Sequence, residues 1–173
     1  MQNKECVSEE LENTNYRTLN IATHNINGIK GKITKLELLA KWGKKEKIDI
    51  IGINKSNISE RIGKFTLKND STYLSFWTSA EENKLKGSGV GFLVNKSWEK
   101  HIGKITRCSN YYIDILLVFK KMKILIIVIY IPPNDKETKK LLQQYIIKKI
   151  RENKRKNIKV IVIDDFNDIC SKT

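Results

Sequence analysis

Apolar and polar positions along the first part of the chain follow the periods of a strand, a helix and a second strand. Residues 18–23 form a short β-prone run that stops at the turn-forming residues 24–28. In residues 31–47 the apolar side chains recur at helical spacing, with lysines on the other side, which predicts an amphipathic helix. The continuous apolar run 48–53 is typical of a strand covered on both faces. The pattern therefore predicts a strand–helix–strand unit.

The middle of the chain is rich in strand-like segments. Residues 73–80 and 87–95 are predicted to form two strands joined by a charged loop. Residues 111–119 and 122–131 are apolar on both faces and are separated only by two lysines, a spacing that permits a hairpin. Strands of this kind belong between layers, so we expect a sheet covered by helices or by a second sheet.

Glycines at positions 87, 89 and 91 allow two interpretations. The GxGxG spacing resembles a loop that holds a phosphate, but inside a strand pattern it more often marks close packing of the backbone. We favour close packing.

A long helix is predicted for residues 135–157, with Asn134 or Asp135 as its N-cap. Its predicted buried stripe consists of Leu141, Leu142, Tyr145, Ile146 and Ile150. Its other side carries the densest run of basic residues, although most such runs are only solvated faces. The candidate phosphate contacts in this run are Lys148, Lys149, Lys154 and Arg155.

The totals favour a single domain. With 173 residues, 40% of them hydrophobic, the chain can bury a core, and no apolar run is long enough to cross a bilayer. We expect residues 1–18 to be a disordered tail and 19–173 to form the domain. The absence of a signal sequence predicts a protein that remains inside the cell. The cysteines are odd in number and far apart, which favours reduced thiols.

The chain carries a formal net charge of +14 from 33 basic and 19 acidic residues. Such an excess attracts polyanions, above all nucleic acid, if the charge gathers on one face. The alternative is that lysine accumulated through biased codon usage, because it is scattered beside abundant Asn and Ile. We favour nucleic acid as the partner and expect no membrane.

Four predicted strands end on polar clusters, at 23–28, 54–57, 130–135 and 164–168. Strand ends in a layered α/β protein converge on one edge, where ligand sites usually lie. Carboxylate and amide oxygens suit Mg²⁺ or Mn²⁺ and phosphate, whereas zinc would require more His and Cys. Each cluster alone is weak support for a site, because Asn and Asp are ordinary turn residues.

The order of the motifs is more specific. It runs N-I-N-G at 25–28, D-I-I-G-I at 49–53, S-G-V-G at 88–91, Y-I-P-P at 130–133 and D-F-N-D at 165–168. This order resembles the endonuclease/exonuclease/phosphatase family, which includes deoxyribonuclease I. The likeness covers residues 19–169 and is nearest to exonuclease III-like apurinic endonucleases and to endonucleases of non-LTR retrotransposons.

The resemblance implies an α/β fold (α+β in some schemes), namely a four-layer α/β/β/α sandwich with mixed sheets. It also implies an enzyme that hydrolyses phosphodiesters with Mg²⁺ or Mn²⁺. It implies that Asp165 orients the attacking water, that Asn167 holds the phosphate and that Tyr130 contacts it. It also implies that Asn25 supports the metal and that Asn27 stands where the family carries Asp or Asn.

Three departures from the family pattern change the expectation. Lys55 occupies the position of the metal-binding Glu, and Asp164 replaces a Gly, where a side chain would crowd the site. The closing Asp-His segment of the family is absent, and neither His24 nor His101 matches it. We therefore expect an incomplete sandwich, weak or lost metal binding, and impaired or absent catalysis.

An incomplete sandwich has a consequence for the surface, because apolar strand surface should be exposed unless a second chain covers it. Two alternatives to an impaired enzyme remain open. One is an active Mg²⁺-dependent endonuclease, and the other is a basic nucleic-acid-binding module without catalysis.

Overall fold

The computed structural model describes residues 18–29, 31–58, 60–78 and 87–164. Its strands are β1 (Ile21–Asn25), β2 (Ile50–Asn54), β3 (Tyr73–Trp77), β4 (Val90–Asn95), β5 (Ile102–Ser109), β6 (Tyr112–Val118), β7 (Lys123–Ile129) and β8 (Lys159–Asp164). Its helices are α1 (Thr34–Lys45), α2 (Glu60–Phe65), the 3-10 helix η1 (Lys96–His101) and α3 (Lys136–Arg155). No helix in the described ranges is both long enough and apolar enough to span a membrane.

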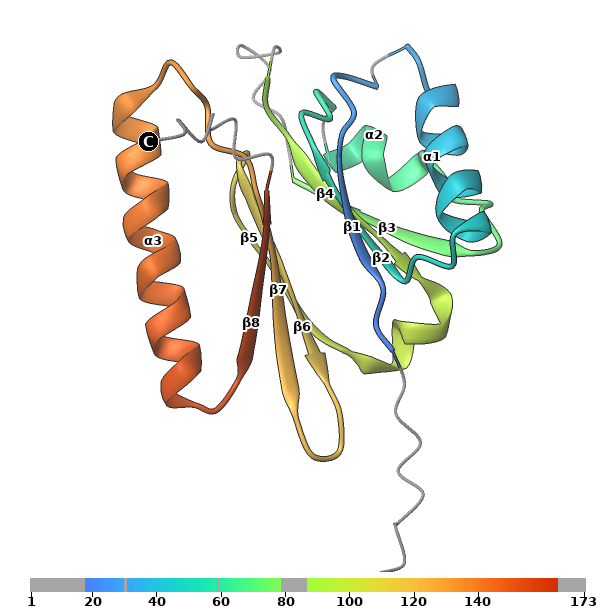
Figure 1. The fold of residues 1–173 in the computed structure, drawn as a ribbon. Coiled ribbons are helices and arrows are strands. Elements are labelled where there is room, and N and C mark those ends of the chain that lie inside the picture. Colours follow the sequence, from blue (N-terminus) through green and yellow to red (C-terminus); the bar gives the residue numbers. More distant parts are fainter. Residues whose placement is uncertain (1–17, 30, 59, 79–86, 165–173) are drawn as a thin grey trace, which may run out of the picture.

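The strands form two four-stranded mixed sheets packed face to face (Figure 1). Sheet A has the order β1-β2-β4-β3, with β1 and β2 parallel and the other pairs antiparallel. Sheet B has the order β5-β6-β7-β8, with β7 and β8 parallel and the other pairs antiparallel. Helices α1 and α2 cover the outer face of sheet A, and α3 covers the outer face of sheet B (Figure 1). The predicted α/β/β/α layering is confirmed.

Alternation along the central strands explains these layers. In β7, Ile124 and Ile126 face the core between the sheets, whereas Leu125 and Ile127 face α3. Because successive side chains of a strand point to opposite faces, a strand that is apolar throughout must be covered twice. The hairpin between β6 and β7 is also confirmed, and the Phe119 N–H donates to the Met122 carbonyl at 2.9 Å to close it.

Helix α3 begins as predicted but buries a narrower stripe. Of the two candidate caps, Asp135 is the one used, because its side chain accepts a hydrogen bond from the Thr138 N–H at 2.9 Å. Leu142 is buried as expected, whereas Leu141 is 60% exposed and Ile150 is 37% exposed, so these two were wrongly assigned to the buried stripe. The helix packs on a single sheet, which covers only a limited sector of its circumference.

The sequence pattern also missed α2 and β5. Helix α2 has only six residues, too few for a helical period to stand out. Strand β5 carries two register shifts against β6, and these irregularities break the alternation that identifies a strand. The expected tail in residues 1–18 lies outside the described residues except for residue 18, so that boundary stays a prediction.

The expectation of exposed apolar strand surface is wrong for the described residues. Among the large apolar side chains of the described strands, Val118 alone is exposed, at 37%. The inner faces of the two sheets cover each other and the helices cover the outer faces, so most apolar side chains of the described strands are buried within one chain, and those of β8 are half-buried.

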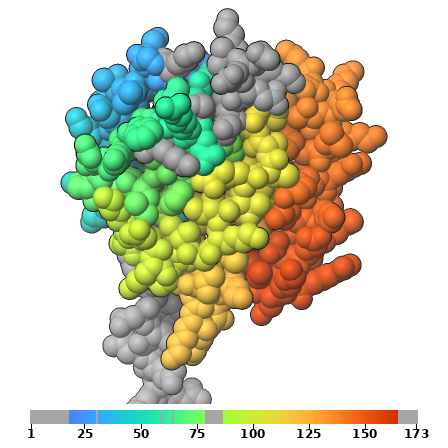
Figure 2. Space-filling model, turned by 180° about the vertical axis from the view of Figure 1, so that it is seen from behind, coloured from blue at the N-terminus to red at the C-terminus, as the bar shows by residue number. Residues whose placement is uncertain are grey.

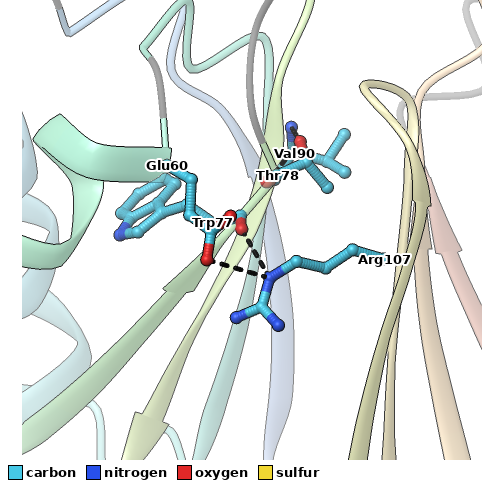
Figure 3. Close-up of polar contacts among 5 residues, drawn as sticks. All are labelled: Glu60, Trp77, Thr78, Val90 and Arg107. Atoms are coloured by element: carbon cyan, nitrogen blue, oxygen red, sulfur yellow. Dashed lines mark hydrogen bonds and ion pairs between the residues drawn. The ribbon is translucent and has the colours of Figure 1, made fainter.

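One side chain joins the two sheets along the β3 and β5 edges. Arg107 of β5 extends to sheet A, where its Nε donates to the Trp77 carbonyl at 2.8 Å and lies 3.8 Å from a carboxylate oxygen of Glu60 (Figure 3). In sheet A, Thr78 and Val90 exchange further hydrogen bonds beside this contact (Figure 3). Arg107 therefore fastens sheet B to both sheet A and α2.

Replacing Arg107 by Met should lower the free energy of unfolding by about 1–3 kcal/mol, because a charged hydrogen bond is lost and the Trp77 carbonyl loses its donor. Urea denaturation measures the change. Arg61→Met on the exposed side of α2 removes the same charge and should stay within about 0.5 kcal/mol of the parent. Equal effects of the two variants would contradict the sheet-joining role.

Candidate functional site

Polar residues gather at the edge of the sandwich where β1, β2 and β8 end and β4 begins, at the upper end in Figure 1. We call this edge the rim. Asn25 and Asn54 pair in register at the ends of β1 and β2. The Asn54 side chain donates from Nδ2 to Oδ1 of Asp164 at 3.4 Å, so it joins the end of sheet A to the end of sheet B. As predicted, the ends of β1, β2 and β8 lie together at this edge.

The N-I-N-G turn after β1 presents two exposed amides. The Asn25 side-chain oxygen accepts a hydrogen bond from the Asn27 N–H at 3.2 Å, which stabilises the turn. Asn27 has a φ of +48°, a left-handed conformation that Asn tolerates better than most residues. The two amides that were predicted to serve a metal thus lie together at the rim and face solvent.

Lys55 lies at the same rim, directly after β2. Its Nζ is 4.9 Å from the centroid of the Tyr130 ring, so the ammonium and the aromatic face attract each other. Tyr130 follows β7 of sheet B and is only 3% exposed. Lys55 therefore reaches from sheet A to sheet B at the position where the sequence predicted a lost metal ligand.

Asp164 lies between the sheets at the rim, and the expectation that its side chain crowds the site stays a prediction. Its side chain is buried, with the residue 7% exposed, and it contacts Asn54 between the two sheets. Asp165 and Asn167, the predicted water-orienting and phosphate-holding residues, lie outside the described residues, so their roles stay predictions.

A second lysine holds the turn after β1 in place. Lys35 of α1 donates from Nζ to the carbonyls of Ile26, Asn27 and Gly28, each at 3.1 Å. An ammonium has three donors, so all of them are used. The Gly28 N–H in turn donates to the Lys55 carbonyl at 2.7 Å. A chain of hydrogen bonds therefore runs from α1 through the turn to the backbone of Lys55.

The glycine-rich segment before β4 packs closely and does not offer an open phosphate cradle. The Asn57 side-chain oxygen accepts from the N–H groups of Gly87 and Ser88 at 3.0 and 3.1 Å. A Cβ added at Gly89 would lie 2.4 Å from the Ser56 hydroxyl, and one added at Gly91 would lie 2.3 Å from the Trp77 ring. The interpretation as close packing is confirmed for Gly89 and Gly91, whereas a Cβ at Gly87 would have its nearest neighbour at 3.7 Å.

The described rim residues do not fit a divalent metal. Mg²⁺ and Mn²⁺ require several oxygen ligands, usually with carboxylates among them. Across the described ranges no three His, Cys, Asp or Glu side chains gather into a metal-binding group. The carboxylate of Asp164 at the rim is buried against Asn54, the carboxylate of Asp135 caps α3, and the cation Lys55 lies at the rim.

The predicted nucleic-acid contacts on α3 separate into two groups. Lys148, Lys154 and Arg155 are exposed. Lys149 turns inward, where its Nζ lies 3.4 Å from Oδ2 of Asp114 and its side chain is 23% exposed. Tyr112 donates to the same carboxylate at 2.6 Å.

Burial of Tyr112, reinforced by this hydrogen bond, raises the pKa of its phenol. The phenol therefore stays neutral and keeps donating to Asp114. The Lys149–Asp114 pair fastens α3 to sheet B and leaves Lys149 poorly placed for a phosphate.

Comparison with solved structures identifies the fold. TDP2 from C. elegans matches with a TM-score of 0.62 at 16% identity, and the match covers 87% of this chain and 48% of that one. An AP endonuclease from Archaeoglobus fulgidus matches with a TM-score of 0.58 at 18% identity, covering 86% and 57%. The human Nocturnin catalytic domain matches with a TM-score of 0.59 at 15% identity, covering 89% and 65%. No protein-family model and no curated protein matches the sequence.

The chain shares the deoxyribonuclease I-like fold of these solved structures. It spans about half of the length of C. elegans TDP2 and 57% of the archaeal endonuclease. The expected nearness to retrotransposon endonucleases stays a prediction. Nothing in the described residues supports the expected second chain.

Sequence reasoning did not single out three residues that organise the rim. Asn54 and Asn57 belong to a cluster that was recognised only as a strand end, and the spacing gave no sign of their partners Asp164, Gly87 and Ser88. Lys35 looked like any lysine on the polar side of a helix, because its three acceptors are backbone atoms that carry no sequence signal.

Replacing Lys35 by Met should speed hydrogen exchange at the amides of Gly28 and Ile29 by about tenfold to a hundredfold, because lost charged hydrogen bonds weaken the turn by about 1–3 kcal/mol. Exchange followed residue by residue by NMR measures this. Lys41→Met, at an exposed position on the same helix, is the control and should leave both amides unchanged. Unaltered exchange at Gly28 in the Lys35 variant would show that the ammonium does not hold the turn.

Proposed function

We propose that the chain is a nucleic-acid-binding domain of deoxyribonuclease I-like fold whose metal-dependent phosphodiester hydrolysis is impaired or lost. The observation that carries the proposal is the position of Lys55, which lies between the sheets at the rim with its ammonium over the ring of Tyr130. By resemblance, this position belongs to a glutamate that binds the metal.

Electrostatics explains the loss of metal. An ammonium supplies no lone pair while it is protonated. At a separation of about 4 Å and an effective dielectric constant of about 20, it would repel a divalent ion by several kcal/mol. Mg²⁺ or Mn²⁺, the cofactors expected from the resemblance, would therefore bind weakly at best. The same positive charge favours a phosphate, so binding can outlast hydrolysis.

The roles proposed for the remaining site residues come from the resemblance. Asp165 would orient or deprotonate the water, Asn167 and Tyr130 would contact the phosphate, and Asn25 with Asn27 would support a weakly held metal. Asn25 and Tyr130 support this proposal only through their shared place at the rim.

Nucleic acid as the partner rests on charge. The net charge of +14 and the exposed Lys148, Lys154 and Arg155 of α3 favour a polyanion. One of the similar structures, TDP2 from D. rerio, was solved in complex with a single-strand DNA product. As part of the proposal, we infer that this chain also binds single-stranded nucleic acid.

An active Mg²⁺-dependent endonuclease is the second candidate. Asn25 and Tyr130, two members of the machinery that the resemblance implies, do lie at one rim, which favours it. The two candidates differ in whether the chain cleaves.

Incubation with supercoiled plasmid and with abasic-site duplex in Mg²⁺ separates them. The parent chain should cleave no faster than an Asp165→Ala variant. Lys55→Glu restores a carboxylate and should gain Mg²⁺-dependent cleavage that the Lys55→Glu/Asp165→Ala pair lacks. Cleavage by the parent above the Asp165→Ala background would overturn the impaired-enzyme hypothesis and establish the second candidate.

Binding of a fluorescent single strand in EDTA tests the phosphate contact itself. Lys55→Gln should reduce the slope of log affinity against log salt by about 0.7, the value for one phosphate contact on a single strand. Lys44→Gln, at an exposed lysine on α1, removes the same charge away from the rim and should change the slope much less. An equal salt slope for Lys55→Gln and the parent would show that Lys55 does not contact a phosphate of the bound strand.

A further inference from the structure

A second concentration of positive charge lies at the end of the sandwich opposite the rim. Two segments far apart in the sequence meet there, the hairpin between β6 and β7 and the turn that joins α3 to β8 (Figure 1). We call this surface the basic end. It consists of Lys120, Lys121, Lys123, Lys154, Arg155, Lys156 and Lys159, all of which are exposed.

The fold holds these segments together. Strands β7 and β8 are parallel neighbours, and Ile124 pairs with Lys159, so the start of β8 lies beside the base of the hairpin. On the other side, the Ile158 N–H donates to the Asn153 carbonyl at 2.9 Å and ties β8 to the last turn of α3. Figure 2 shows the hairpin projecting from the same end of the molecule as this turn.

The segments that form the basic end carry no acidic residue, and the acidic residue that directly precedes them, Glu152, lies 4.0 Å from Lys148. Residues 118–124 and 153–163 contain no Asp or Glu. Within the described part of the chain, none of the seven basic side chains forms an ion pair. Elsewhere lysines do find carboxylates, as Lys148 does with Glu152 at 4.0 Å and Lys149 with Asp114.

The basic end is too far from the rim to serve the same phosphate. Strand β7 has seven residues and extends about 23 Å, and α3 has twenty residues and extends about 30 Å. Both elements run from one end of the sandwich to the other (Figure 1). A nucleotide held near Lys55 therefore cannot touch Lys121 or Arg155.

We propose that the basic end is a second nucleic-acid site, one that grips the phosphate backbone of a duplex without reading its bases. The inference goes beyond the rim but rests on the proposed function for its choice of nucleic acid. Seven exposed cations on one surface supply the counterion release that drives backbone binding. A hollow of about 340 Å³ between Lys154 and Lys159 gives the surface a concave part for a protruding backbone.

The apolar side chains at this end favour a nucleic acid over an anionic membrane. Binding at a bilayer interface usually buries a broad apolar face beside the basic one. Among the described residues, the exposed large apolar groups of this end are Val118 and Met122 of the hairpin and Ile150 beside the hollow, at 37%, 42% and 37% exposure, too few for a broad apolar face. Charge therefore dominates this surface.

The test compares two triple variants with the same change in net charge. One replaces Lys120, Lys121 and Lys123 of the hairpin by Gln, and the control replaces Lys41, Lys44 and Lys45 of α1, which are also exposed. Affinity for a fluorescent duplex is measured from about 50 to about 200 mM salt. The hairpin variant should reduce the salt slope by about 2 to 3, at about 0.9 per phosphate contact, and the control by less than about 1.

Other outcomes decide against the proposal. Equal slopes for the two triple variants would show that only total charge matters. Loss of binding to phosphatidylserine vesicles in the hairpin variant, with duplex binding unchanged, would assign the surface to a membrane instead. A second set, Lys154→Gln with Arg155→Gln and Lys159→Gln, should repeat the hairpin result, and an unchanged slope there would also overturn the proposal.

The proposal for the rim and the proposal for the basic end can be contradicted independently. The rim is measured with a single strand and the Lys55 variant, and the basic end with a duplex and the hairpin variant. A Lys55 effect without a hairpin effect contradicts the second site alone. A hairpin effect without a Lys55 effect contradicts the proposed rim contact and supports the basic end.

Discussion

The close approach of the two sheets at Gly52 determines where the rim residues meet. A Cβ at this position would lie 2.5 Å from Ile163 and 2.8 Å from Val128, so the backbone of β2 packs directly against side chains of sheet B. Asn54 lies two residues beyond Gly52 and Asp164 one residue beyond Ile163, which is why their side chains reach each other. Without this contact the ends of β2 and β8, which belong to different sheets, would lie apart and share no site. Packing between the sheets therefore brings the rim residues together.

The layers could be predicted from the sequence because β7 is apolar at nearly every position and β6 almost so, and only burial on both faces explains that pattern. The meeting of strand ends could also be predicted, since parallel strands end at one edge. Three features could not. Lys35 acts on backbone carbonyls, Lys149 turns inward to a carboxylate 35 residues earlier in the sequence, and β5 loses its alternation to irregular pairing. Each depends on contacts between separate elements of the fold, which periodicity does not report.

The cations of the two ends of the molecule are held differently. At the rim, Lys35 is saturated by three carbonyls and Lys55 lies over an aromatic ring, so local groups stabilise each ammonium. At the basic end, exposed charges of one sign repel one another, and the repulsion costs stability that a bound polyanion would relieve. Under the proposed function, the rim would place a single phosphate group, whereas the basic end would attract many phosphates with little regard for position. A nucleic acid longer than the protein could occupy both.

At position 55 the neighbouring segments fix the conformation of the backbone, whereas the side chain sets the local charge. Asn27, Lys55 and Asn57 have φ values of +48°, +55° and +53°, where a non-glycine residue carries a conformational cost of about 1–2 kcal/mol. Asn tolerates this conformation, but Lys has no such preference. The hydrogen bond from the Gly28 N–H to the Lys55 carbonyl and that from the Ser56 N–H to the Gly89 carbonyl impose it. Because neighbouring segments fix the backbone there, the side chain at 55 does not determine the shape of the turn. What it determines is the sign of the charge between the sheets, and under the proposed function that sign would decide whether the rim favours a metal ion or a phosphate.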